Sequence, residues 1–386
     1  MEKLIYNYDV VVIGGGVAGV SAALASARSN KKTLLIESTY MVGGLATSGL
    51  VAFFLPIDDG EGHQISYGIC EELFRLSILH GYEGNYPEAW LNNGTIEEKI
   101  KKRFDVQFNP HLFAILCEQK LVSEKVDLLY GCIISSAVVE DGKIVKLIGH
   151  TRTQDVEVFA SSFVDSTGDA TICEKAGVPT NCAERGNVQT NWYYSIEDGK
   201  YNIHMMGSCD YVYSDGKEHT WFKGLDSNEL TDVTVVGHRN IMEDFLKKGD
   251  GTDKYAIATI STIPELRMTR KFVGEEEMKK DENGLYKENS LGLITSWLTS
   301  GLNYELPAGC LYNKNVKNLY VAGRCISVFN DHMWDITRGI PACTVTGEAS
   351  GYLAANFPDN TKIDIKKSQC DLSSRGVKIH LSELGL

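Results

Sequence analysis

The sequence lacks several features that would place it in other classes of protein. Its ten cysteines form no C-x-x-C pair and no zinc-type spacing, so a dithiol relay and a zinc site are not expected. No apolar run reaches the roughly 18 residues of a membrane span, and no charged segment with an apolar stretch precedes the first predicted strand. We therefore expect a cytoplasmic protein with reduced, mostly buried thiols and no bound metal.

Positive charge is also scarce. The 386 residues carry 38 lysines and arginines against 51 aspartates and glutamates, a formal net charge of −13. Basic clusters such as Lys99 to Arg103 are short and follow Glu97 and Glu98, so they are expected to be solvated helix surface. This balance disfavours nucleic acid and anionic membranes as partners. A small-molecule substrate is expected, and a homo-oligomer is compatible with the sequence.

The N-terminal segment has the pattern of a dinucleotide-binding unit. The apolar run from Val10 to Ile13 predicts a buried parallel strand, and it leads into a glycine-rich turn and an alanine-rich helix. In this turn Gly14 permits the sharp bend, Gly16 lets the backbone approach a pyrophosphate, and Gly19 lets helix and strand pack closely.

A second strand supports this interpretation. Residues 32–36 are predicted to form it, and it ends at Glu37, 18 residues after Gly19, where an acid binds the ribose hydroxyls of an adenosine. The alternative is a glycine-rich turn that binds no ligand.

Two further segments are expected near the same ligand. Residues 41–50 form a second loop of small residues, which a dinucleotide with a bulky second half would need beside its ribityl chain and ring. From Val126 to Phe163 the apolar period of two predicts a strand, a hairpin turned at residues 140–143 and another strand, a β-meander typical of flavoproteins. After it, Gly168 is predicted to approach the nucleotide, whereas Asp165 and Asp169 are read as turn and helix-cap residues rather than catalytic acids.

The second half of the chain changes character and then returns to nucleotide-binding motifs. Residues 185–305 are rich in aromatics with strand-like segments, so a mixed or antiparallel sheet is expected over the cofactor; the aromatics either line a pocket or fill a core. Within it, Arg267 and Arg270 suit an anionic substrate or an internal ion pair equally well. Residues 318–324 then predict a buried strand that ends in glycine. Residues 339–347 lead into a helix whose N-terminus would stabilise the anion of a reduced cofactor.

These segments predict an α/β protein with a Rossmann-like FAD-binding domain, an inserted β-meander and a second, α+β substrate or cap domain. The expected boundaries are 1–55, 105–185 and 306–360 for the FAD-binding domain, 56–104 for a helical and loop insertion, 186–305 for the cap domain and 361–386 for a C-terminal extension.

The order of these motifs resembles the bacterial FAD-dependent oxidoreductases related to fumarate reductase and other glutathione-reductase-type flavoproteins. The matching blocks are GGGxAG, Glu37, GGLAT, VDSTGDA, IPELRMTRKFVGE, YELPAGCLY, NLYVAGRCIS and PACxxTGEASG, which span residues 8 to 357. The resemblance implies FAD as the cofactor. It also implies a pyrophosphate at the first glycines, the adenosine ribose at Glu37 and the flavin beside residues 44–47.

By motif and resemblance together, the expected cofactor-binding residues are Gly14, Gly16, Val17, Ala18, Gly19, Glu37, Ser38, Gly43, Gly44, Leu45, Ala46, Thr47, Ile133, Thr167, Gly168, Gly323, Arg324, Thr346 and Gly347. One departure stands out. Many relatives end the late strand in Gly-Asp, whose acid binds a ribityl hydroxyl, whereas this chain has Gly323 and Arg324, as does the closer family that it resembles, so the ribityl contact is left open.

The expected activity is hydride transfer between flavin N5 and a small polar metabolite at a CH–OH or CH–CH centre. His332 is the candidate acid or base, and Arg338 and Arg267 are candidate substrate anchors. No second strand-linked GxGxxG follows residue 50, so a separate pyridine-nucleotide domain is not expected. The alternatives are a flavoprotein electron-transfer subunit that works with a protein partner and, ranked last, an NAD-dependent dehydrogenase.

Overall fold

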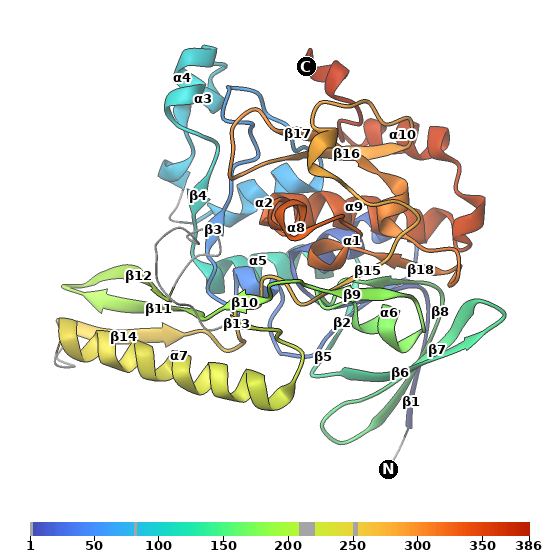
Figure 1. Ribbon diagram of the computed structural model, residues 1–386, viewed down its shortest axis with the longest axis horizontal. Coiled ribbons are helices and arrows are strands. Elements are labelled where there is room, and N and C mark those ends of the chain that lie inside the picture. Colours follow the sequence, from blue (N-terminus) through green and yellow to red (C-terminus); the bar gives the residue numbers. More distant parts are fainter. Residues whose placement is uncertain (1–2, 81–82, 208–220, 250–253) are drawn as a thin grey trace.

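The centre of the protein is one large sheet, seen in a computed structural model that describes residues 3–80, 83–207, 221–249 and 254–386. Its strand order is β5-β2-β1-β8-β7-β6, and β18 pairs with the end of β8 (Figure 1). These strands are β1 (Lys3–Ile13), β2 (Thr33–Glu37), β5 (Asp127–Tyr130), β6 (Ile133–Glu140), β7 (Lys143–His150), β8 (Asp155–Asp165) and β18 (Leu319–Val321). The fold is α/β, as predicted.

The sheet has a parallel core and an antiparallel extension. β5, β2, β1, β8 and β18 run parallel, because each forms parallel ladders with its neighbours. The hairpin of β6 and β7 pairs antiparallel with the first half of β8, which confirms the predicted β-meander. Val10 to Ile13 are buried between β2 and β8, as their apolar side chains require.

Helices pack around this sheet. They are α1 (Val17–Ala27), α2 (Ile69–Ser77), α3 (Glu88–Leu91), α4 (Ile96–Lys101), α5 (Pro110–Ser123), α6 (Thr171–Lys175), α7 (Ser227–Lys248), α8 (Asp331–Thr337), α9 (Ile340–Asn356) and α10 (Ile365–Ser374).

The first and the late helix of the cofactor-binding motifs lie side by side in the centre of Figure 1. A Cβ atom on Gly351 of α9 would lie 2.1 Å from the carbonyl oxygen of Ala22 on α1, so the two backbones are in direct contact. Ser21 strengthens the contact, since its hydroxyl donates to the carbonyl of Thr344 at 2.7 Å. Both ends of the chain therefore build one core.

Residues 185–305 contain the expected antiparallel sheet and one unexpected helix. The sheet has the order β12-β11-β14, with β11 (Thr190–Glu197), β12 (Lys200–Gly207) and β14 (Tyr255–Ile260). The 22-residue helix α7 packs against it, whereas the sequence predicted strand-like segments there. The contact is close, because a Cβ on Gly237 of α7 would lie within 2.4 Å of the side chain of Asn191 on β11.

The remaining strands form short antiparallel pairs. They are β3 (Phe53–Phe54) with β4 (Val106–Gln107), β9 (Thr180–Cys182) with β15 (Arg270–Phe272), β10 (Asn187–Val188) with β13 (Trp221–Phe222), and β16 (Ser290–Thr295) with β17 (Asn303–Pro307). The first pair brackets the predicted insertion of residues 56–104. β16 packs against α9 and α10, while the domain boundary at residue 306 stays a prediction.

The cysteines of the described ranges are unpaired. Seven are buried, and Cys182 and Cys370 are exposed, while Cys209 lies outside the described residues. No helix in the described ranges is long and apolar enough to cross a membrane.

Candidate FAD site

The candidate site is a cavity of about 510 Å³ where the parallel strands β1, β2, β8 and β18 end. Ligands of open α/β sheets bind at this edge, and the volume lies within the range of about 300–1,000 Å³ for cofactor and ligand sites. The lining residues are Ile13, Gly14, Gly16, Val17, Ala18, Ile36, Glu37, Ser38, Thr39, Gly43, Gly44, Leu45, Ala46, Ser48, Cys132, Ile133, Ile134, Ser166, Thr167, Gly168, Asp169, Thr171, Ile172, Leu230, Ile263, Pro264, Leu266, Gly323, Arg324, Arg338, Ile340 and Cys343.

The turn between β1 and α1 is shaped by three glycines with different tasks. Gly14 has a φ of +101°, and a Cβ there would lie 2.5 Å from the carbonyl oxygen of Ser166. A Cβ on Gly19 would lie 1.8 Å from the carbonyl oxygen of Gly14, so this glycine is required for packing. A Cβ on Gly16 would meet no protein atom within 4 Å, because this residue faces the cavity. No side chain caps α1, so its first turn offers an anion its N–H groups and dipole.

The second glycine loop lies directly against the first. Gly43 donates its N–H to the carbonyl of Gly15 at 2.7 Å, and it forms a parallel bridge with Gly16. A Cβ on Gly44 would lie 3.0 Å from the Cα of Gly16. The cavity wall continues from the α1 turn along residues 43–46 and Ser48.

Glu37 lies in the cavity wall beside Gly15 of the glycine turn. Its Oε2 accepts a hydrogen bond from the N–H of Gly15 at 2.7 Å, and its Oε1 accepts from the N–H of Thr39 at 2.7 Å. The carboxylate is therefore fixed at the cavity wall, where it can accept hydrogen bonds from ribose hydroxyls.

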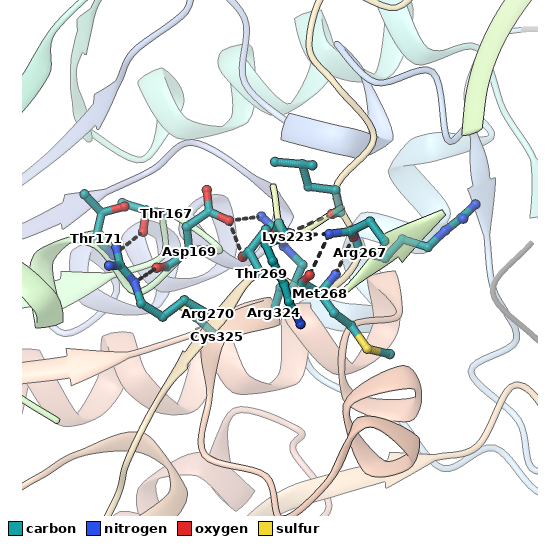
Figure 2. Close-up of polar contacts among 12 residues, drawn as sticks. Thr167, Asp169, Thr171, Lys223, Arg267, Met268, Thr269, Arg270, Arg324 and Cys325 are labelled. Carbon is teal, nitrogen blue, oxygen red and sulfur yellow. Dashed lines mark hydrogen bonds and ion pairs between the residues drawn. The ribbon is translucent and has the colours of Figure 1, made fainter. Parts of the chain in front are cut away.

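The turn after β8 contains two aspartates with separate tasks, of which Asp169 is labelled in Figure 2. Asp165 is fully buried and accepts from the N–H groups of Ile172 and Cys173, so it fixes the start of α6 as predicted. Burial raises the pKa of the Asp165 carboxyl above its ordinary value. Asp169 was also read as a cap, but its Oδ1 instead accepts from Arg324 at 2.7 Å and from Thr269 at 2.6 Å.

The last wall of the cavity is the junction of α8 and α9. Arg338 precedes Gly339, the residue before the first turn of α9, and its Nε donates to Asp335 Oδ1 at 3.0 Å. Its guanidinium lies 5.7 Å from the ring centre of Trp297. Cys343 follows on α9, and burial raises the pKa of its thiol to about 12, so it is a neutral thiol at this wall.

Most of the predicted cofactor residues line the cavity. Those that do are Gly14, Gly16, Val17, Ala18, Glu37, Ser38, Gly43, Gly44, Leu45, Ala46, Ile133, Thr167, Gly168, Gly323 and Arg324. The other four lie behind the wall: Gly19, Thr47, Thr346 and Gly347. Thr346, for example, is fully buried and accepts from the N–H of Gly323 at 2.9 Å.

The predicted catalytic residues divide in the same way. Arg338 lines the cavity, whereas His332 and Arg267 are not among its lining residues. Arg267 is buried and forms an ion pair of 2.6 Å with Glu265, so the internal ion pair is the alternative that the fold selects. The role of His332 as an acid or base stays a prediction, without a contact to the cavity to support it.

Other lining residues were not predicted. Thr39 follows the predicted ribose acceptor Glu37, and Ser48 lies in the predicted loop of residues 41–50. Cys343 lies in residues 339–347, which were predicted to lead into a helix. Leu230 comes from α7, and Ile263 and Pro264 come from the segment before Arg267. Of the two alternatives for the aromatics of residues 185–305, pocket lining is not seen, since none of the described ones lines the cavity; Tyr211 and Tyr213 lie outside the described residues.

This geometry fits a long dinucleotide with a bulky second half. An acceptor for ribose, an uncapped helix start with open space at Gly16, and a glycine-lined continuation follow one another along the cavity. In the described part of the chain, no group of three or more His, Cys, Asp or Glu side chains is arranged to hold a metal ion. Fold and site together define a dinucleotide-binding flavoprotein.

The chain belongs to the FAD dependent oxidoreductase family, whose family model matches residues 9–193 and 287–369. FAD is its cofactor, and the protein is an FAD-dependent enzyme. The matched ranges contain all lining residues except Leu230, Ile263, Pro264 and Leu266. The segment between them contributes these four residues to the cavity wall.

Curated relatives match shorter parts of the chain. Thioredoxin reductase of Ureaplasma parvum is 30% identical over 95 residues, which cover 25% of this chain and 29% of the relative. The tRNA uridine 5-carboxymethylaminomethyl modification enzyme MnmG of Streptococcus agalactiae is 30% identical over 167 residues, 42% of this chain and 24% of the relative. The chain thus matches less than a third of the length of either protein. A geranylgeranyl bacteriochlorophyll reductase-like protein of Thermoplasma acidophilum superposes with a TM-score of 0.49 and 14% identity, covering 99% of this chain and 87% of that one.

Proposed function

We propose that this FAD-dependent enzyme oxidises or reduces a small metabolite with an anionic group, at a CH–OH or CH–CH centre. The observation that carries the proposal is the position of Arg338, which lines the FAD cavity beside the start of α9. When bound, FAD supplies the hydride chemistry at its flavin ring. The chain must then hold the substrate against the ring and exclude water.

Arg338 has the features of a substrate anchor. Asp335 and Trp297 hold its guanidinium in place, and Trp297 is itself fixed by donating its Nε1–H to the carbonyl oxygen of Asp335 at 2.9 Å. A guanidinium with a fixed orientation binds carboxylates in a defined geometry and loses little entropy on doing so. The proposed partner of Arg338 is therefore a carboxylate or a similar planar anion.

The start of α9 adds to the same effect. This 17-residue helix begins at the cavity wall with Gly339 as its N-cap, and no side chain caps it. The positive end of its dipole favours negative charge at this place, on the substrate or on the reduced flavin.

The apolar lining of the cavity supports a small and partly apolar substrate. Leu230, Ile263, Pro264 and Leu266 contribute apolar groups from outside the family-matched ranges. Apolar walls exclude water and strengthen the charge interaction with Arg338. We propose that residues 186–305, with α7, act as the substrate cap.

The names of the MnmG relatives favour a different substrate, a transfer RNA. The match covers only 24% of the Streptococcus agalactiae protein, and this chain has a formal net charge of −13. Nucleic-acid binding depends on clustered positive charge. We therefore propose the small metabolite and treat tRNA as the competing outcome. A relation to fumarate reductase within the family stays a proposal from motif order alone.

The test is anaerobic bleaching of the flavin absorption band. Purified holoenzyme is mixed with hydroxy acids, dicarboxylates, uncharged polyols and bulk tRNA, each with and without prior reduction of the flavin by dithionite. We expect a carboxylate either to bleach the absorption band of the oxidised flavin or to restore that band in enzyme that was reduced beforehand. Redox turnover with uncharged polyols alone, or stable binding of tRNA without any response to carboxylates, would overturn the proposal. A response only to a co-purifying protein would favour the electron-transfer subunit.

A further inference from the structure

Arg324 is the residue at which this chain departs from the Gly-Asp pattern of many relatives, and its surroundings are specific. It follows Gly323 at the end of β18 and lines the cavity. One terminal nitrogen of its guanidinium donates to Asp169 Oδ1 at 2.7 Å, and the other donates to the carbonyl oxygen of Leu266 at 2.7 Å (Figure 2). The side chain is thus held from two different loops.

The turn after β8 leaves room for this side chain. A Cβ on Gly168 would lie 2.8 Å from the guanidinium of Arg324, so any other residue there would displace it. The predicted reason for Gly168 was close approach of the nucleotide. Contact with Arg324 is a second reason for a glycine at this position.

Gly323, the residue before Arg324, lies against the first turn of α1. A Cβ on Gly323 would lie 2.7 Å from the Cβ of Ala18, one of the residues of that turn. The N–H of Gly323 donates to Thr346 and serves the protein itself. The part of this strand end that offers a charge to a ligand is therefore the side chain of Arg324.

The charges of the cavity indicate what Arg324 would meet. The described charged side chains that line it are Glu37, Asp169, Arg324 and Arg338. Glu37 lies where the ribose is expected, and Arg338 lies at the start of α9. The FAD pyrophosphate carries two negative charges, and the dipole of α1 compensates only about half a charge.

We propose that Arg324 binds the FAD pyrophosphate and that Asp169 is its positioning residue. The ion pair with Asp169 and the bond to Leu266 fix the guanidinium in the wall of the cavity that the uncapped start of α1 also lines, one residue after the contact of Gly323 with Ala18. In this chain the residue after the late glycine then serves the phosphates, in place of an acid that serves the ribityl chain.

The experiment measures FAD affinity rather than turnover. Holoenzyme is diluted, and released FAD is followed by its fluorescence to give a Kd; the midpoint potential is measured at saturating FAD. Arg324→Met should raise the Kd for FAD about 10- to 100-fold, the range expected for loss of a charge-assisted hydrogen bond. Arg324→Lys keeps the positive charge, so its Kd for FAD should lie between those of the wild type and of Arg324→Met. The midpoint potential should stay at the wild-type value.

Arg270→Met is the matched control. Arg270 donates its Nε–H to the backbone carbonyl oxygen of Asp169 at 2.9 Å, but it does not line the cavity. It should leave the Kd within about twofold of wild type. Equal losses in the Arg324→Met and Arg270→Met proteins would show a merely structural role. An unchanged Kd with a shifted midpoint potential would place Arg324 at the flavin ring, and either result would overturn the proposal.

Asp169 is tested as a positioning residue by two variants. Asp169→Ala removes the carboxylate that accepts from Arg324. It should raise the Kd for FAD when Arg324 is present, but it should change the Kd little when Arg324 is already replaced by Met. Asp169→Asn keeps an acceptor oxygen and should rescue most of the affinity. Equal losses from Asp169→Ala in both backgrounds would contradict a role through Arg324.

Discussion

Gly347 of α9 lies on the backbone of Ala18 in α1: a Cβ added to Gly347 would be 2.3 Å from the Ala18 carbonyl oxygen. Ala18 lines the FAD cavity in the first turn of α1, and Gly347 lies on the helix whose start forms another part of the cavity wall. The distance between these two parts of the wall is therefore set by the contact of these two residues.

The first prediction concerns this helix contact. Gly347→Ala should lower the free energy of unfolding by about 1–3 kcal/mol, because the added methyl group overpacks the α1–α9 interface. It should also weaken FAD binding, since the walls of the cavity move apart. Urea denaturation and FAD titration measure the two effects. Gly84→Ala is the control, since a Cβ there meets no atom within 4 Å and should change stability by less than about 0.5 kcal/mol.

The second prediction concerns the substrate. Arg338→Gln should lower kcat/KM for the anionic substrate by about 10- to 100-fold, because a charge-assisted hydrogen bond is lost. FAD affinity should stay close to wild type. Arg338→Lys should recover only part of the loss, since an ammonium group cannot reproduce the planar contacts with Asp335 and Trp297. Wild-type kcat/KM in the Arg338→Gln enzyme would rule out the anchor.

The third prediction concerns pH and stability. Glu348 is buried on α9, where its Oε2 accepts from the N–H of Ile69 at 2.8 Å. Burial raises the pKa of its carboxyl from 4.5 to about 7. The folded protein then binds this proton more tightly than the unfolded chain, so the free energy of unfolding decreases as pH rises from about 4.5 to about 7.

Glu348→Gln removes this titration and keeps an acceptor oxygen for Ile69. Relative to wild type, the variant should gain about 2 kcal/mol in free energy of unfolding between pH 5 and pH 8. Urea denaturation at both pH values, with saturating FAD, measures the difference. The control Glu140→Gln, at an exposed carboxylate, should leave the pH dependence of the free energy of unfolding unchanged. A wild-type pH dependence in the Glu348→Gln protein would contradict a buried, proton-binding carboxyl.

Much of the fold and of the FAD site could be predicted from sequence because their signals are local. The turn at Gly14 to Gly19, the acid at Glu37 and the hairpin at residues 140–143 each lie within one strand–turn unit. Parallel strands bring such turns to one edge of a sheet, so local motifs also predict their neighbourhood.

Helix α7 could not be recognised in this way. Its middle, from Thr231 to Gly237, is rich in β-branched residues and ends in glycine, a composition that favours a strand. The start signal was present, since Asp226 caps the helix through the N–H groups of Asn228 and Glu229. Packing on β11 overrides the local preference, and the cavity residue Leu230 was missed with the helix.

The pairing of charged side chains depends on tertiary contacts alone. The sequence offers both Arg267 and Arg338 as substrate anchors. In the fold, Arg267 pairs with Glu265 and does not line the FAD cavity, whereas Arg338 does line it. Asp169 was read as a cap from its position in a turn. Its partner Arg324 lies 155 residues further along the chain, beyond the reach of any local pattern.

The most direct test of the central claim, that the cavity between α1 and α9 holds FAD, compares two glycines of one turn. Gly16→Ala adds a methyl group that meets no protein atom, and Gly19→Ala adds one that would lie 1.8 Å from a backbone oxygen. Visible absorption of the purified proteins gives the FAD content, and urea denaturation gives the stability. We predict that Gly16→Ala keeps about wild-type stability without ligand and loses FAD, while Gly19→Ala loses stability. A Gly16→Ala protein that binds FAD with wild-type affinity would contradict the assignment of this cavity.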